Sequence, residues 1–417
     1  MQINTGDTAW VLLSAALVFI MTPGGVAFFY GGMVREKNVI TTMFQILAVV
    51  VIVSLQWVLF GYSLSFGPDL KGGIIGNLDF AFMNGVGVKP DTNYAATIPA
   101  QAFSIFQMMF AIITPALVVG GMAERIKLSS FFVVILLWTT LVYDPLAHWV
   151  WSTDGWLRKL GVLDFAGGTV VHIASGVSGL VAALYLGKRA EYGSPSIKPH
   201  NVPFVLLGAI LLWFGWFGFN AGSSLSANGL AASTFFTTNT AAAAGILGWI
   251  LIEKIKTGHA SLMGASAGAV VGLVAITPAA GYVTIIGSIF IGFIGGIVCF
   301  YASTFMKKKF GYDDALDVFG GHGIGGTWGA LATGIFATVA VNSAGANGLI
   351  YGNPKQVLVQ LLGIVVGWVF SGGMTYLILK VVDKVMGLRV TKEEELIGLD
   401  QVIHNEYAYP ESLKEIQ

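Results

Sequence analysis

Apolar segments long enough to cross a lipid bilayer recur along the whole sequence, and short polar loops separate them. The eighth of these segments, at residues 261–277, is short and rich in glycine, so it needs helical neighbours rather than lipid around it. An odd number of spans would place the two termini on opposite sides of the membrane. We expect eleven transmembrane helices, at about residues 9–33, 40–65, 101–122, 130–151, 165–187, 203–224, 234–253, 261–277, 283–306, 317–339 and 355–384.

The composition agrees with this pattern. Hydrophobic residues make up 55% of the 417 positions and charged residues only 11%, whereas a soluble domain carries about 25% charged residues. We therefore predict an all-α polytopic membrane protein that is solvated mainly by the lipid bilayer. The formal net charge is zero, so nothing favours nucleic acid as a partner. Cys299 is the single cysteine, which excludes a disulfide within the chain.

The basic residues predict the orientation of the chain in the membrane. Seventeen of the 22 Lys and Arg residues lie in one set of alternate loops and at the C-terminal end, and five lie elsewhere. Cytoplasmic loops carry the excess of positive charge, so we expect the N-terminus outside and the C-terminus in the cytoplasm. No cationic stretch precedes the first apolar segment, which we therefore expect to be retained and not cleaved as a signal peptide.

A short internal sequence repeat predicts the domain organisation. The segment LDFAGG opens the fifth expected helix at Asp164, and LDVFGG opens the tenth at Asp317. The two copies lie an odd number of helices apart and enter from opposite faces, as in a five-plus-five inverted repeat with a final helix. We expect a transmembrane domain at 1–384, with halves at about 9–187 and 203–339 and a last helix at about 355–384. A long outer loop would cover 66–100, and a cytoplasmic tail 385–417.

Histidines inside a bilayer are costly and need a reason. His172 follows Asp164 by eight residues, and His322 follows Asp317 by five, in two glycine-rich runs. The offsets differ by about one helical turn, so both imidazoles can project toward one region. They could be unrelated core residues, but the repeat favours a hydrogen-bonded pair that lines a narrow path. For Asp164 and its expected counterpart Asp317, we prefer a helix cap to direct substrate contact.

Two helix faces mix aromatic with polar side chains. Trp216, Phe219, Asn220 and Ser223 share one face of the sixth helix, and Phe103, Phe106, Gln107 and Phe110 share one face of the third. Trp151 lies near the outer end of the fourth. Each stripe alone is more typical of packing or lipid contact. Together they could hold a small cation by cation–π attraction, with a hydroxyl that accepts its N–H.

The segments FQMMFAIITPALVVGGMAER, LDFAGGTVVHIASG, KPHNVPFVLLGAILLWFGWFGFNAGS and DVFGGHGIGG resemble the ammonium transporter (Amt/Rh) family, in particular its Amt branch. The similarity runs over nearly the whole chain. It implies an eleven-helix inverted repeat, a homotrimer with one pore per protomer, and no cofactor. It also implies a tail that couples protomers and a PII-type signalling protein that can block the cytoplasmic side.

The resemblance also assigns roles to individual residues. It implies an outer recruitment site for ammonium or its analogue methylammonium, a phenyl gate, and a twin-histidine pore, with Asp164 ordering the vestibule. The recruitment residues would be Phe106, Phe110, Trp151 and Ser223, the gate Phe110 and Phe219, and the pore lining His172, His322, Trp216 and Thr277.

These inferences predict a transporter or channel for ammonium, moved as ammonia plus a proton or as the ion, in the plasma or inner membrane of the cell. No enzyme signature such as a Walker loop, HExxH or GxSxG occurs. Three alternatives remain: an ammonium sensor with little flux, a bis-histidine haem membrane protein, and a channel for urea or a neutral gas. The tail of roughly 30 residues is too short for a signalling domain.

Overall fold

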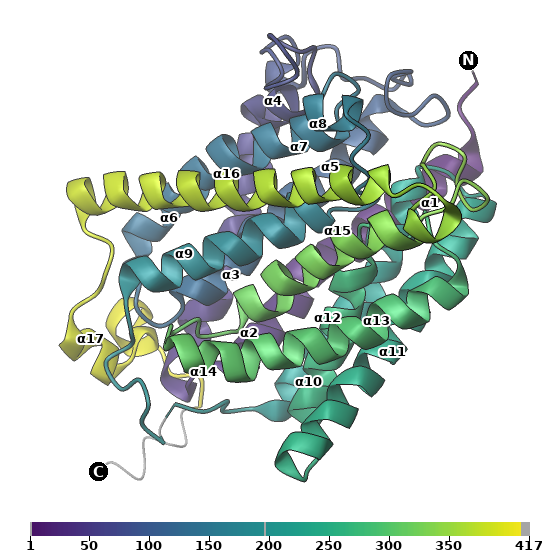
Figure 1. Ribbon diagram of the computed structural model, residues 1–417. Helices are drawn as coiled ribbons and strands as arrows, with labels where there is room; N and C mark the ends of the chain where they lie inside the picture. The colour runs from purple at the N-terminus through teal and green to yellow at the C-terminus, as the bar shows by residue number, and fades with distance from the viewer. Residues whose placement is uncertain (1, 196, 410–417) are drawn as a thin grey trace.

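The computed structural model describes residues 2–195 and 197–409, and its regular structure is helical throughout (Figure 1). Nine helices of the described chain are long and apolar enough to cross a membrane. Two shorter ones complete the bundle, α12 (Leu262–Ile276) and a continuous helix over residues 319–336. The predicted polytopic fold with eleven helices is therefore confirmed.

Most of the long helices are built from several joined parts. The first three spans are α1 (Thr5–Ile20), η1 (Met21–Val26) and α2 (Ala27–Met33); η2 (Glu36–Asn38), α3 (Val39–Gln56), η3 (Trp57–Gly61) and α4 (Tyr62–Phe66); and α5 (Ala100–Met122). The next three are α6 (Leu128–Trp138), η5 (Thr139–Tyr143) and α7 (Asp144–Trp151), followed by the short α8 (Trp156–Lys159); η6 (Gly168–Ile173) and α9 (Ala174–Leu186); and α10 (Val202–Trp216), η7 (Phe217–Ala221) and η8 (Gly222–Ser224).

The second half continues in the same way. It contains α11 (Gly229–Thr257), then α12, then α13 (Ile285–Tyr301), η9 (Ala302–Met306) and α14 (Lys307–Phe310), then η10 (Phe319–Gly323) and α15 (Ile324–Phe336), and finally α16 (Lys355–Met386). Short turns lie at η4 (Ala81–Met83) and η11 (Leu349–Tyr351), and the tail holds α17 (Lys392–Ile397) and η12 (Asp400–His404).

The ends of α11 show why some predicted boundaries were too short. The predicted helix at 234–253 extends to Gly229–Thr257. Asn228 caps the first turn through its side chain, which accepts from the backbone N–H of Ala231, and Gly258 ends the helix with a left-handed φ of 81°. Both signals lie in polar sequence, so a search for apolar segments alone passes over them.

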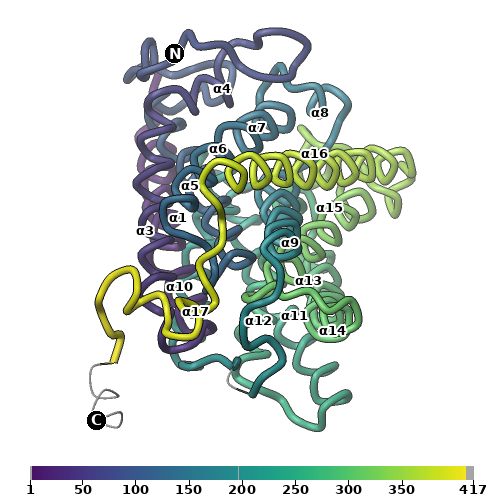
Figure 2. The backbone as a smooth tube through the Cα atoms, turned by 90° about the vertical axis from the view of Figure 1, so that its left-hand side faces the viewer, coloured from purple at the N-terminus to yellow at the C-terminus, as the bar shows by residue number. Residues whose placement is uncertain are grey.

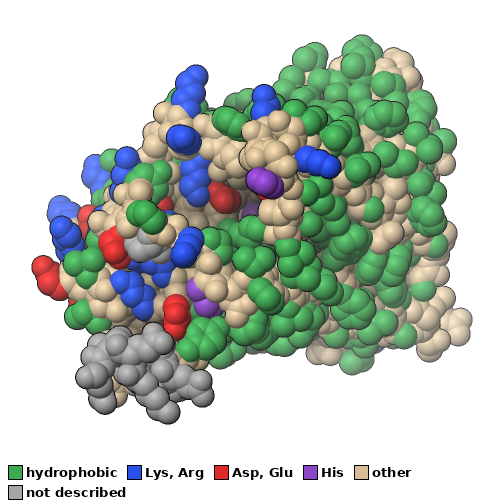
Figure 3. All heavy atoms as spheres, turned by 90° about the horizontal axis from the view of Figure 1, so that it is seen from below, with side chains coloured by type: hydrophobic (Ala, Val, Ile, Leu, Met, Phe, Trp, Pro, Cys, Tyr) green, Lys and Arg blue, Asp and Glu red, His purple; other side chains and the backbone are tan. Residues whose placement is uncertain are grey.

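Burial separates a central helix from a lipid-facing rim. In the most apolar stretch of α5, 83% of the residues are buried, whereas only 28% are buried in the corresponding stretch of α16. Large apolar side chains such as Leu47, Leu55 and Val369 are exposed on the rim. Figure 3 shows the resulting green, apolar flank beside a face where charged side chains gather. An apolar exterior of this extent requires lipid around it.

The start of α1 and the tail helix α17 lie at opposite ends of the bundle in both views (Figures 1 and 2). We call the end that holds Asn4 the N face, and the end that holds α17 the tail face. The tail folds back onto the loops of its own chain. The Asp400 carboxylate accepts from the backbone N–H groups of Ile40 and Thr41 at 2.9 and 2.7 Å, and Leu399 donates its N–H to the Asn38 side chain at 2.9 Å.

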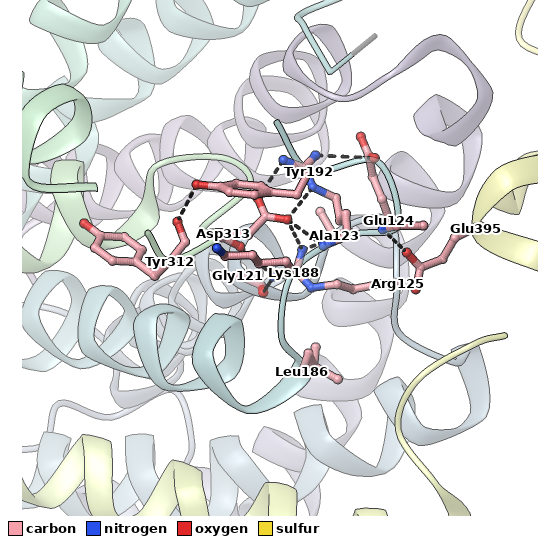
Figure 4. A network of polar contacts seen from close by, with 12 residues as sticks. Gly121, Ala123, Glu124, Arg125, Leu186, Lys188, Tyr192, Tyr312, Asp313 and Glu395 are labelled. Carbon is pink, nitrogen blue, oxygen red and sulfur yellow. Dashed lines mark hydrogen bonds and ion pairs between the residues drawn. The ribbon is translucent and has the colours of Figure 1, made fainter. Parts of the chain in front are cut away.

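A buried ion network ties the loops of the tail face together (Figure 4). The Glu124 carboxylate accepts from the side chain of Arg35 at 2.6 Å and lies 3.4 Å from Arg189. Arg189 in turn pairs with Asp313 at 2.8 Å. Burial alone would raise the pKa of Asp313, but hydrogen bonds and charge from Arg189, with the charge of Arg125, hold that pKa below its ordinary value.

Candidate functional site: an aromatic column between two cavities

A cavity of about 450 Å³ opens on the N face. Its lining includes four predicted site residues, Phe110, Trp151, Asp164 and Ser223. The Ser223 hydroxyl donates its proton to the carbonyl of Phe219 at 2.8 Å. Because that proton is used, the hydroxyl oxygen offers only its lone pairs to the cavity, and it can accept a hydrogen bond from an N–H donor.

Phe110, which lines this cavity, packs against Phe219, which does not line it. Their ring centroids lie 4.4 Å apart, and the planes are tilted by 41° rather than parallel. Trp151 meets Phe110 edge-on at 5.6 Å. Phe106 is fully buried behind Phe110, with 5.0 Å between centroids, and does not line the cavity. The predicted recruitment residues therefore cluster, with Phe106 as a support for Phe110.

The two histidines lie directly beneath the phenyl rings. His172 stacks on Phe219 with 6.0 Å between centroids, and on Trp216 with 5.5 Å. Its Nδ1 atom lies 3.2 Å from Nδ1 of His322. We call the series Trp151, Phe110, Phe219, His172 and His322 the aromatic column. It joins residues from five helices, four of them consecutive spans and the fifth, which carries His322, distant in the sequence.

The histidine contact defines what the pair can do with protons. A hydrogen bond between two Nδ1 atoms requires one of them to donate, so two neutral rings must be in opposite tautomers. Nε2 of His172 is buried and has no hydrogen-bond partner in the described chain. One ring can thus take up a proton at Nε2 and release its Nδ1 proton to the other, which is the requirement for a relay.

A second cavity, of about 230 Å³, lies on the tail-face side of the histidines and has His322 in its lining. Tyr30, Glu253 and Asp317 also line it. Neither Tyr30 nor Glu253 stands out in the sequence, because each lies toward the end of an ordinary apolar helix. The aromatic column therefore lies between two cavities that open toward opposite faces.

Trp216 and Thr277 support the column from the side. The Trp216 indole N–H donates to the Thr277 hydroxyl at 2.9 Å, and this hydroxyl donates to the Leu273 carbonyl at 2.7 Å. Both are fully buried. With its hydroxyl engaged on two sides, Thr277 fixes the orientation of the Trp216 ring that stacks on His172.

Local helix geometry explains how each histidine reaches the column. His172 lies in the π-helical turn η6 and His322 in the π-helical turn η10. A π turn widens the helix and is frequent at functional sites. The Asp164 carboxylate caps η6, since it accepts from the backbone N–H groups of Gly167, Gly168 and Thr169 at 2.6 to 2.8 Å. The cap preferred from the sequence is the arrangement in the structure.

The expected counterpart of Asp164 was wrong. Asp314, not Asp317, plays the same part in the second half, because its carboxylate accepts from the N–H of Phe319 in η10 at 2.8 Å. Asp314 also precedes His322 by eight residues, the offset of Asp164 from His172. The matching letters LD misaligned the repeat by three residues. Asp317 instead pairs with Lys307 at 2.7 Å.

Glycines let the two histidine helices touch. Gly176 and Gly326 each follow their histidine by four residues. A Cβ at Gly176 would overlap the backbone of Gly323, and one at Gly326 would lie 2.9 Å from Cβ of His172. These reciprocal contacts bring the two repeat-related helices together beside the histidine pair.

The column does not suit a haem. A metal ion binds imidazole nitrogen at about 2.0–2.1 Å, so two axial histidines need about 4 Å between their nitrogens. The Nδ1 atoms are only 3.2 Å apart, and Trp216 and Phe219 lie against the His172 ring. The bis-histidine haem alternative therefore does not fit.

These features define the class of protein: a multi-pass membrane transporter with an inverted repeat. Comparison with known proteins gives the family. Residues 9–409 match the model of the Ammonium Transporter Family. An ammonium transporter of Bacillus subtilis (strain 168) is 53% identical over 408 residues, which cover 98% of this chain and 99% of that protein.

Solved structures give the same result. The crystal structure of Saccharomyces cerevisiae Mep2 superposes with a TM-score of 0.88 at 37% identity, over 94% of this chain and 89% of that one. A structure described as a sensor Amt protein superposes with a TM-score of 0.87 at 32% identity, over 95% and 98%. The chain therefore belongs to the ammonium transporter family, and the resemblance seen in the sequence is confirmed.

Proposed function

We propose that the protein carries ammonium through the aromatic column, from the N-face cavity to the tail-face cavity. The observation that carries this proposal is the contact of 3.2 Å between Nδ1 of His172 and Nδ1 of His322. This contact lies between two cavities that reach opposite ends of the molecule. An apolar, protein-lined route with hydrogen-bonding nitrogens at its centre suits a small solute with N–H groups.

The N-face cavity is the recruitment site in this proposal. The faces of Phe110 and Trp151 attract a desolvated cation by roughly 0.5–2 kcal/mol each. Ser223 accepts one N–H through the lone pairs that its bond to Phe219 leaves free. Phe106 holds Phe110 in place. Methylammonium, which keeps three N–H donors, serves as an experimental analogue.

Past Phe110 and Phe219 the cation would lose its remaining water. A bare charge at the centre of a bilayer costs several kcal/mol. The twin histidines offer a way to lower this cost, because the cation can leave its proton on an imidazole and continue as ammonia. Proton and ammonia would recombine in the tail-face cavity. Passage as the intact ion is the variant of this mechanism in which the histidines act only as hydrogen-bond partners.

Orientation, division into domains and assembly are part of the same proposal. Charged side chains gather on the face that includes the tail (Figure 3), which supports a cytoplasmic tail and an outer N-terminus in the cell membrane. The transmembrane domain would cover 1–384 and the tail 385–417, of which 410–417 lie outside the described residues. A homotrimer with one route per protomer, and a PII-type protein at the tail face, follow from the family resemblance.

Flux measurement tests the proposal. Purified protein in liposomes on a solid-supported membrane is given a pulse of ammonium, and uptake is measured in parallel. A current or ammonia uptake above that of empty liposomes is expected. Binding of ammonium without current or uptake would favour an ammonium sensor instead. Permeation by urea but not by ammonium would favour a urea or neutral-gas channel.

A further inference from the structure

Asp317, which lines the tail-face cavity, forms an ion pair that the route described above does not use. Asp317 lines this cavity together with His322. The Lys307 ammonium group lies 2.7 Å from the Asp317 carboxylate. Both side chains are partly exposed, Lys307 to 20% and Asp317 to 33%. The pair is therefore positioned at the mouth of the cavity and not in the packed core.

The backbone at Asp317 is left-handed. Its φ is +55°, in a region that aspartate adopts more readily than most residues other than glycine. Here it accompanies a carboxylate that caps no helix, since Asp314 provides the cap of η10.

Lys307 is chemically close to the transported solute. A lysine head group is a primary ammonium with three N–H donors on a flexible stem. It differs from methylammonium only in the length of its carbon chain. The Lys307 contact therefore shows that the Asp317 carboxylate is placed to bind an ammonium group at hydrogen-bonding distance.

The cavity also carries more acid than base. Glu253 also lines the cavity, accepts from the Ser261 hydroxyl at 2.7 Å and forms no ion pair within the part of the chain that the structure describes. The lining therefore includes two carboxylates, and Lys307 contacts only that of Asp317. A free cation that reaches the cavity past His322 enters a field that favours it.

We propose that Asp317 is the binding group for ammonium on the tail-face side, and that Lys307 is a tethered ammonium which occupies this group until the free cation displaces it. The inference rests on the proposed function, because the cation reaches Asp317 only if the column conducts. Small primary ammonium ions are the class of ligand. Lys307 then competes with the solute and sets its apparent affinity from the tail face.

The test compares apparent affinity from the two faces. Inverted membrane vesicles, with the tail face outward as verified by protease access to a C-terminal tag, take up labelled methylammonium; intact cells report the N face. The variants are Lys307→Met, Lys307→Arg, Asp317→Asn and the double variant Lys307→Met with Asp317→Asn. Lys308→Met is the matched control, because it removes the neighbouring charge of α14, which is exposed.

We expect Lys307→Met to lower the KM from the tail face about threefold, the factor that corresponds to a partly exposed ion pair. Asp317→Asn should raise it by a similar factor, and the double variant should match Asp317→Asn because the competitor has lost its site. Lys307→Arg and Lys308→Met should keep the wild-type value. Elution of each purified variant as a single peak at the wild-type volume in size-exclusion chromatography shows that it is folded.

Equal tail-face KM values for wild type, Lys307→Met and Asp317→Asn would overturn the inference while leaving the proposed function intact. Independent, additive effects of the two substitutions would overturn it as well. A lower melting temperature of Lys307→Met without any change in KM would show that the pair is only a structural contact. Wild-type protein without uptake from either face would remove the proposed function, and the inference with it.

Discussion

Gly176→Ala tests most sharply how the histidine pair is positioned. The added Cβ would overlap the backbone nitrogen and Cα of Gly323 and lie 2.9 Å from the carbonyl carbon of His322. Backbone atoms cannot rotate away as a flexible side chain would. Because non-bonded carbons prefer about 3.5–4 Å, α9 and η10 must separate by about 1 Å or more.

The size of the effect follows from this displacement. The distance of 3.2 Å between the two Nδ1 atoms would grow beyond hydrogen-bonding range. Forcing a methyl group into a closed contact costs about 1–3 kcal/mol, and the lost hydrogen bond about 1 kcal/mol more. We expect Gly176→Ala to destabilise the protein by about 2–4 kcal/mol and to abolish most methylammonium uptake.

Two further glycines calibrate the measurement. The added Cβ of Gly326→Ala lies 2.9 to 3.0 Å from its neighbours, so a smaller separation of the helices relieves the contact. The loss of uptake and stability should therefore be smaller than in Gly176→Ala. Gly373 on α16 has nothing within 4 Å of its added Cβ, and Gly373→Ala should leave uptake unchanged. Melting temperature and uptake are measured on the same preparations. Wild-type stability and uptake in Gly176→Ala would refute the packing argument.

Three other predictions concern the recruitment site and the tail face. Ser223→Ala should raise the KM for methylammonium about tenfold in uptake assays, as one hydrogen bond to a cation is lost, while Ser224→Ala should not; equal KM values would contradict the role of Ser223. Glu124→Gln should cost about 1.5–3 kcal/mol in denaturant unfolding, because Arg35 and Arg189 each lose one charged partner but keep a second, Glu191 or Asp313; a wild-type midpoint would contradict this. The pKa of Asp313 is held low, so its carboxylate stabilises the fold at neutral pH, and this contribution should fade as the pH falls below about 4. The melting temperature of Asp313→Asn should therefore fall less than that of the wild type when the pH is lowered. Identical pH profiles of the two proteins would count against the network.

The helical bundle could be predicted from the sequence because each spanning helix is a continuous run of about twenty mostly apolar residues. The limits of α11 were less accessible, since Asn228 and Gly258 act through backbone geometry outside the apolar stretch. The histidine pair was accessible for a different reason. His172 and His322 are polar residues in a place where polarity is costly, so their presence alone indicates a site.

The predictions failed where the role of a residue depends on contacts with residues far away in the chain. The echo of two letters favoured Asp317 as the counterpart of Asp164, but the cap belongs to the residue whose carboxylate reaches the N–H groups of η10, which is Asp314. Likewise, nothing in the sequence of α12 reveals that the Thr277 hydroxyl is used up by Trp216 and Leu273. Such pairings join residues far apart in the chain and leave no local pattern.

The most direct test of the account is methylammonium uptake by proteoliposomes that contain His172→Ala, His322→Ala or His259→Ala. The first two remove the contact at the centre of the aromatic column, whereas His259 is exposed and serves as the control. We expect uptake, and its selectivity for ammonium over other small cations, to change in both column variants and to stay the same in the control. Wild-type uptake and selectivity in both column variants would contradict it.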